Sequence, residues 1–235
     1  MQHCPKGLRP LLLGKTHHRA DIVNCHPPLH LHVARAMQVS DAELGILIEY
    51  VENRQEVLQR IGDFYGVVPK LCKYVVLTVL NGGTPWAWIE KCNCALNRHR
   101  IAPELQALEE VARVVHKAFL NWPAYEGQIA SLRRHLEVTK KANVDGAKAR
   151  LDATKDATEK KAAREAWRTA LYKATPRAIN RSLFATCAFE LEDTVLGVID
   201  AHLRRNGWTV TSLIFDEVIV EARADACFTE AIRGA

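Results

Sequence analysis

The sequence contains no apolar stretch long enough to span a membrane. Its longest uncharged run, residues 74–89, is broken by Asn81-Gly82-Gly83 and Pro85. It is also shorter than the ~20 apolar residues that a membrane-spanning helix requires. We therefore expect a protein that has no membrane partner.

A disulfide framework is also missing. The chain has seven cysteines, an odd number spread along its length, and no secretory leader precedes them. Disulfide-stabilised secreted domains usually carry even numbers of cysteines at regular spacings. The pattern favours reduced thiols and an intracellular protein, and it does not indicate the compartment.

The spacings of the common structural zinc sites are absent too. Cys25, His26, His30 and His32 lie close together, and a Cys-Asn-Cys segment begins at residue 92. A zinc centre is therefore the main alternative site, but neither group has the usual ligand spacing. His30-Leu31-His32 alternates as in a strand or a loop, and we interpret these residues as ordinary core and surface residues.

Charge of one sign does not dominate the chain. The formal charge is +5 over 235 residues, which is compatible with a polyanionic partner without requiring one. Residues 138–174 are rich in Lys, Ala, Glu and Asp. Between Lys140 and Arg168 there are nine Lys/Arg and five Asp/Glu. This composition predicts a charged helical hairpin, broken near residues 143–146. A solvated surface is its simpler role, and a nucleic-acid contact is the alternative.

Local signals predict strands at both ends of the chain and helices between them. Residues 8–13 and 20–23 favour a first β-hairpin. A capping box at Ser40 and Glu43 and prolines at helix starts predict the intervening helices. We expect further helix boundaries at Pro69, Leu80, Thr84-Pro85, Pro103 and Asn206-Gly207.

Two adjacent carboxylates, Asp216 and Glu217, interrupt an apolar, β-branched run over residues 212–221. Apolar residues on both sides predict two strands with the acids at their turn. Burying like charges is costly unless a cation compensates them, so this turn is a candidate metal site. A solvated acidic turn is an equal alternative. The preceding helix has apolar residues at steps of four, which predicts packing on the sheet.

The order of the motifs resembles the family A DNA polymerases. Arg177-Ala178-Ile179-Asn180, the long helix and the run over residues 213–221 are similar to the closing portion of that family, whose third motif is usually His-Asp-Glu. Asp21 falls where the first motif places an aspartate at a strand end. Lys73, eight residues before Asn81-Gly82, matches the second motif. The similarity covers roughly residues 20–222.

The resemblance implies an α+β fold, with an antiparallel palm sheet backed by helices and a large helical fingers insertion. The expected division is a first part of the palm over residues 1–52, fingers with the charged hairpin over 53–175, and a second part of the palm over 176–235. The implied function is template-directed nucleotidyl transfer to a primer 3′ end. Its partners are primer–template nucleic acid and nucleoside triphosphates.

Nucleotidyl transfer uses two divalent ions a few ångströms apart, and Mg²⁺ prefers oxygen ligands. By resemblance, Asp21 and Asp216 bind two Mg²⁺ ions, or Mn²⁺ in their place. Glu217 is an auxiliary ligand, and the backbone carbonyl of Ile22 assists. Asp21 and Asp216 are far apart in the sequence, so they meet only if their strands are neighbours in one sheet.

The resemblance also implies four substrate-binding residues. Lys73 would neutralise triphosphate charge, and Lys70 lies one helical turn earlier, where an exposed surface role is the simpler one. Asn81 replaces a tyrosine of the family, which predicts weaker base stacking. His26 replaces a glutamate that excludes ribonucleotides, so the sugar preference is open.

The family's thumb has no counterpart here, because few residues precede Asp21. We expect a minimal palm-and-fingers module or a piece of a longer protein, with a thumb supplied by another chain or domain. Two alternatives stay open. One is a catalytically silent relative that binds nucleic acid or a partner, and the other is an unrelated helical metal-binding or scaffold protein.

Overall fold

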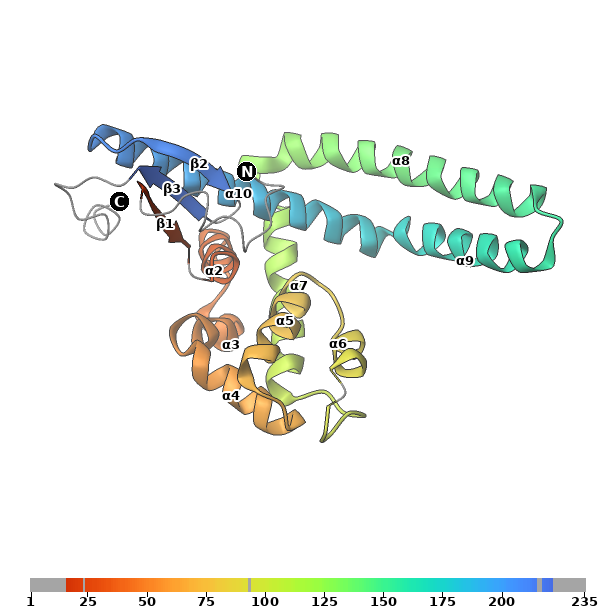
Figure 1. Ribbon diagram of the computed structural model, residues 1–235, viewed down its shortest axis with the longest axis horizontal. Helices are drawn as coiled ribbons and strands as arrows, with labels where there is room; N and C mark the ends of the chain where they lie inside the picture. Colours follow the sequence, from red (N-terminus) through yellow and green to blue (C-terminus); the bar gives the residue numbers. More distant parts are fainter. Residues whose placement is uncertain (1–15, 23, 93, 215–216, 222–235) are drawn as a thin grey trace. The chain divides into compact units, whose positions relative to one another are not determined.

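The computed structural model describes residues 16–22, 24–92, 94–214 and 217–221. The chain divides into two compact units (Figure 1). Unit 1 consists of Met1–Leu29 and Ala188–Ala235, and unit 2 of His30–Cys187. Unit 2 is therefore continuous in the sequence, whereas unit 1 is assembled from the two ends of the chain.

Unit 1 contains a three-stranded antiparallel sheet in the order β1-β3-β2. Its strands are β1 (His17–Asp21), β2 (Val210–Ile214) and β3 (Glu217–Glu221). The amino-terminal strand thus pairs with the carboxyl-terminal one, as the sequence predicted. The register places Ala20 opposite Val218 and Asp21 opposite Glu217. The two predicted strand ends lie side by side.

The core of unit 1 forms between the sheet and the end of α10 (Pro176–Arg205). Gly207 adopts a φ of 77°, its N–H donates to the Arg204 carbonyl, and the Trp208 N–H donates to the Leu203 carbonyl. These two bonds are the left-handed glycine cap predicted for this helix. Buried apolar side chains then join helix and sheet: Leu196, Leu203, Trp208, Val210, Val218 and Val220.

Unit 2 is helical, and most of its core comes from four helices of the predicted region. These are α3 (Asp41–Glu52), α4 (Arg54–Tyr65), α5 (Pro69–Leu80) and α7 (Pro103–Leu120), with the short α6 (Trp86–Lys91) between the last two. The capping box is confirmed, because Ser40 accepts from the Glu43 N–H and donates to its carboxylate. Their largest buried side chains are Leu44, Leu47, Tyr50, Ile61, Tyr65, Leu80, Leu105, Leu108 and Phe119.

A helix that the sequence did not predict, α2 (His26–Ala36), follows β1. Its two prolines lie in the first turn, where a missing N–H costs no hydrogen bond. The prediction that His30-Leu31-His32 alternates as in a strand or loop is therefore wrong. His30 is 1% exposed, and its ring contacts those of Phe119 and Phe184 edge-on. It is a core residue.

The charged hairpin is present, but its break lies elsewhere. A short 3₁₀ turn, η2 (Pro123–Tyr125), leads into α8 (Glu126–Ala153), and α9 (Ala157–Lys173) packs against α8. The predicted break at residues 143–146 is wrong, because a single mid-helix glycine costs only about 1 kcal/mol. The chain instead turns before Asp156, whose carboxylate accepts from the Thr158 and Glu159 N–H groups.

The structure confirms the broad α+β class with a small antiparallel sheet, while its assignment to a palm with fingers remains a prediction. The functional boundaries expected at residues 52 and 175 also remain a prediction. The compact units divide at other residues, after Leu29 and after Cys187. None of the helices in the described part of the chain is both long enough and apolar enough to cross a membrane.

Candidate anion-binding site

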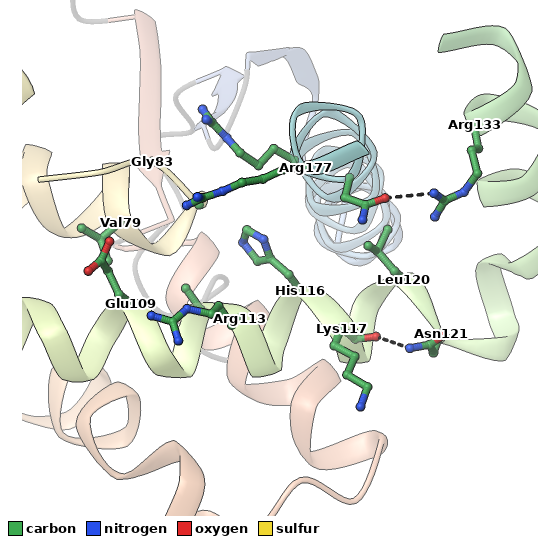
Figure 2. Close-up of a pocket in the computed structure, with 14 residues that line it drawn as sticks. Val79, Gly83, Glu109, Arg113, His116, Lys117, Leu120, Asn121, Arg133 and Arg177 are labelled. Carbon is green, nitrogen blue, oxygen red and sulfur yellow. Dashed lines mark hydrogen bonds between the residues drawn. The ribbon is translucent and has the colours of Figure 1, made fainter. Parts of the chain in front are cut away.

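A pocket of about 650 Å³ lies within unit 2, where the end of α5 meets α7, α8 and α10 (Figure 2). Five of its lining residues are cationic and one is acidic, Glu109. The cations come in two pairs at helical i, i+4 spacing, with one from α8. They are Arg113, Lys117, Arg133, Arg177 and Arg181.

The end of α5 forms one wall of the pocket because two glycines turn the chain sharply. The Gly82 N–H donates to the Val79 carbonyl and the Gly83 N–H to the Thr78 carbonyl, each at 2.8 Å. Gly82 has a φ of 75°, which L-residues rarely adopt. A Cβ there would lie 2.7 Å from His116 Cε1. The close approach of α5 to α7 therefore requires glycine at this position.

His116 is fixed at the centre of this wall. Its Nε2–H donates to the Leu80 carbonyl at 2.8 Å, one of the carbonyls left unpaired at the end of α5. Its ring stacks on Phe184, with centroids 3.7 Å apart. Burial lowers the pKa of His116, the hydrogen bond to Leu80 opposes that effect, and the nearby charge of Arg181 adds to it. The ring is thus held in its neutral form.

Two arginines of the pocket donate hydrogen bonds to neutral partners. Arg133 Nη1 donates to Asn180 Oδ1 at 2.9 Å, and Arg181 Nη1 donates to the Tyr172 hydroxyl at 3.4 Å. Arg181 Nε is buried and has no hydrogen-bond partner in the described part of the chain. The ion pairs found among the described residues include none of the five cations.

A pocket with this donor set suits an anion. Arginine presents planar, bidentate donors that match phosphate and carboxylate oxygens. Clustered cations without carboxylate partners attract a ligand of opposite charge and raise its local concentration. The Nε–H of Arg181 is a buried donor for which such a ligand would supply an acceptor. The arrangement can therefore hold phosphate groups.

No pattern in the sequence predicted this pocket. Its residues come from four helices, and no short motif contains them. Two signals were visible, namely the i, i+4 pairs Arg113/Lys117 and Arg177/Arg181. Such pairs are common on solvated helix faces, so spacing alone could not separate a pocket from a surface.

The predicted catalytic residues lie in unit 1, apart from this pocket in the sequence. Asp21 ends β1 and Glu217 begins β3, and the backbone register pairs them. Asp216 lies outside the described residues. Ile22 packs against the core of unit 1. The strand adjacency that the metal site requires is present, and the roles of the carboxylates stay predictions.

Among the residues that the structure describes, no group of three or more His, Cys, Asp or Glu could hold a metal ion. Asp216 is not one of those residues, so the predicted pair that it forms with Asp21 stays a prediction. The finding bears in part on the alternative zinc site, because Cys25 and His30 are both described and both buried, and the His30 ring packs against the rings of Phe119 and Phe184. The donor chemistry of two carboxylates on paired strands fits Mg²⁺.

The predicted substrate-binding residues fall in different places. Lys73 is half-buried and Lys70 exposed on α5, and neither lines the pocket. Asn81 caps the same helix directly before the two pocket glycines. His26 Nε2 lies 3.0 Å from Glu192 Oε2, and its ring packs edge-on against Phe189. No sequence pattern predicted this His26–Glu192 pair.

Comparison of the chain with models of protein families, with curated proteins and with solved structures produced no match. The function must therefore be argued from the residues and their geometry.

Proposed function

We propose that the protein is a template-directed nucleotidyltransferase that adds nucleotides to a primer 3′ end, with a catalytic centre similar to that of the family A DNA polymerases. The observation that carries the proposal is the pairing of Asp21 with Glu217, two residues from opposite ends of the chain. The resemblance required these strand ends to be neighbours. A chance acidic turn in an unrelated fold would have no reason to lie beside Asp21.

In this proposal the carboxylates of Asp21 and Asp216 bind Mg²⁺ or Mn²⁺, with Glu217 and the Ile22 carbonyl as further oxygen donors. The bound ions would lower the pKa of the attacking 3′-hydroxyl and stabilise the departing pyrophosphate. Lys73, half-buried on α5, would neutralise charge on the triphosphate. The finer assignment of residues 1–52 and 176–235 to a palm, and of residues 53–175 to fingers, belongs to this proposal.

The cationic pocket supports a nucleic-acid partner independently of catalysis. Its arginines are suited to the phosphates of a polynucleotide backbone, which supply most of the affinity of such complexes. The pocket therefore also favours a second candidate function, a catalytically silent protein that binds nucleic acid. The two candidates differ in the role of the carboxylates.

Primer extension separates them. With Mg²⁺ or Mn²⁺, the native chain should extend a primer on a template, and Asp216→Asn should reduce the rate by at least about a hundredfold. Losses of this size are typical when a group that stabilises transition-state charge is removed. Asp193→Asn, an exposed carboxylate of α10, is the matched control and should leave the rate unchanged.

Binding of the same primer–template, followed by fluorescence anisotropy, completes the test. A folded native chain that binds but does not extend would support the silent candidate. Extension that Asp216→Asn leaves intact would contradict the proposed catalytic centre.

A further inference from the structure

The cationic pocket of unit 2 keeps its excess of positive charge when the neighbouring acids are counted. Its lining residues carry five positive charges and one negative charge, a formal +4. Three acids lie about one helical turn from pocket arginines, namely Glu109, Glu110 and Glu137. None of the three belongs to an ion pair in the described part of the chain. The α10 wall has no acid in its sequence over residues 176–187. The charge of the pocket is therefore not compensated by the protein itself.

The cations of the pocket converge on one hollow and do not follow a line. They come from three helices, as Figure 2 shows for Arg113 of α7, Arg133 of α8 and Arg177 of α10, and all five line the same space of about 650 Å³. A polynucleotide strand spreads its charge along its length, at one phosphate per ~3.4 Å. Pockets for small ligands have volumes of roughly 300–1,000 Å³. The arrangement therefore favours a compact polyanion over a polymer.

The turn after α5 makes room for Arg181 in the wall of this pocket. A Cβ at Gly82 would lie 3.0 Å from Arg181 Cγ, in addition to its contact with His116. Arg181 Nε is buried and has no hydrogen-bond partner among the described residues. A buried donor without an acceptor is costly, and a phosphate oxygen of a ligand would supply the acceptor. Arg181 is thus the observation that points to a bound anion.

A second hollow, of about 560 Å³, borders the cationic pocket between the end of α7 and the first turns of α8. The two share Leu120, Asn121 and Arg133. The second hollow is less cationic, because only Arg133 and Arg134 line it and Glu126 offsets one of their charges. Its remaining lining is apolar and consists of Leu120, Pro123, Ile129 and Ala130. Apolar walls with a few polar groups are typical of sites for small organic ligands.

We propose that the cationic pocket binds the phosphates of a nucleoside triphosphate and that the second hollow receives its nucleoside. A triphosphate carries about four negative charges, one on each inner phosphate and nearly two on the terminal one. That charge matches the +4 of the lining residues. Arg133, which both hollows share, contacts the phosphate nearest the sugar. The inference deepens the proposed function, and it rests on that function only in treating the ligand as a substrate.

Equilibrium dialysis of ATP against the full chain in EDTA tests the proposal. Side-chain cations hold phosphates without a metal, whereas the proposed carboxylate centre would hold a triphosphate through Mg²⁺. EDTA therefore removes binding at the carboxylates and leaves binding in the pocket. The native chain and Asp216→Asn should bind ATP equally. A folded native chain that does not bind ATP would overturn this inference without bearing on the catalytic centre.

The pocket variant is Arg113→Gln with Arg177→Gln, which changes two exposed side chains of the pocket. ATP affinity should fall by at least about a hundredfold, about tenfold for each charged donor that is lost. The matched control is Arg164→Gln with Arg168→Gln, which removes two exposed arginines of α9 outside the pocket. It should bind ATP like the native chain, and circular dichroism should show native helix content in both variants. Equal losses in the two variants would show that net charge alone governs binding, and would overturn the proposal.

The second hollow is tested by Ala130→Leu, which partly fills it. This change should weaken binding of ATP and leave binding of inorganic triphosphate unchanged. Ala149→Leu, at an exposed position of α8 that lines neither hollow, should change neither. Inorganic triphosphate that binds the native chain as tightly as ATP would contradict the role of the second hollow. An oligonucleotide that binds in the pocket where ATP does not would assign the pocket to a polynucleotide and overturn the proposal.

Discussion

At the scale of single residues, Gly82 determines how α5 meets α7. Its left-handed φ, and the 2.7 Å that would separate a Cβ at this position from His116, exclude other residues without a shift of the ring. The ring itself is held by the Leu80 carbonyl and by Phe184. The wall of the cationic pocket is therefore sensitive to a single methyl group.

We predict that Gly82→Ala lowers the free energy of unfolding by about 1–3 kcal/mol. The left-handed backbone alone costs an L-residue about 1–2 kcal/mol, and the contact with His116 adds to that cost. Gly146→Ala is the matched control, because nothing lies within 4 Å of the added methyl group. There we expect stabilisation of up to about 1 kcal/mol from helix propensity. Urea unfolding of the two variants and the native chain measures both effects.

His116 predicts a pH dependence of stability. Its pKa in the folded protein lies below the ordinary value of 6.5. Below pH 6.5 the unfolded chain therefore binds a proton at His116, whereas the folded chain binds it only at a lower pH. The free energy of unfolding should therefore be highest above pH 6.5 and decrease as the pH falls through the pKa of His116 in the folded protein. Urea midpoints of the native chain should fall on acidification, whereas those of His116→Gln should fall less.

The control for this prediction is His135→Gln, which changes an exposed histidine of α8. Its urea midpoints should follow those of the native chain over the whole pH range. If His116→Gln shows the same acid dependence as the native chain, burial of this ring does not govern the acid stability of unit 2.

At the scale of helices and strands, the sequence predicted elements best where a strong local signal marks each end. α5 was predicted from Pro69 to Leu80 because proline suits the first turn and Asn81-Gly82-Gly83 closes the last. The Gly207 cap that follows the end of α10 was predicted for the same reason. The break within α8 was predicted wrongly because Asn143 and Gly146 resemble a turn, although tertiary context tolerates both inside a helix.

The helix α2 and the cationic pocket were missed for a different reason. Pro27 and Pro28 argue against a strand, and the same residues are acceptable in the first turn of a helix, so the local signal is ambiguous. The pocket depends on distances between four helices, which periodicity does not encode. The β1–β3 pairing was predicted because the carboxyl-terminal strands need a partner strand, and the resemblance added the requirement that Asp21 and Asp216 be neighbours.

At the scale of the whole molecule, the division of the chain has a consequence for stability. Unit 2 is one continuous segment, whereas unit 1 depends on β3 pairing with both β1 and β2. Forming the β1–β3 pair closes a loop that contains most of the chain. The entropy cost of that closure is larger than the cost of forming local contacts. We therefore expect unit 1 to open more readily than unit 2.

We predict that Val220→Asp opens unit 1 and leaves unit 2 folded. Val220 is 0% exposed, and an unpaired carboxylate there should cost about 3 kcal/mol or more. The matched control is Val198→Asp, an exposed position of the same unit, where we expect a change within about 0.5 kcal/mol. In hydrogen exchange, Val220→Asp should speed exchange in the strands and the end of α10, while α4, α5 and α7 keep native protection. Equal loss of protection in both groups would show that the chain unfolds as one unit.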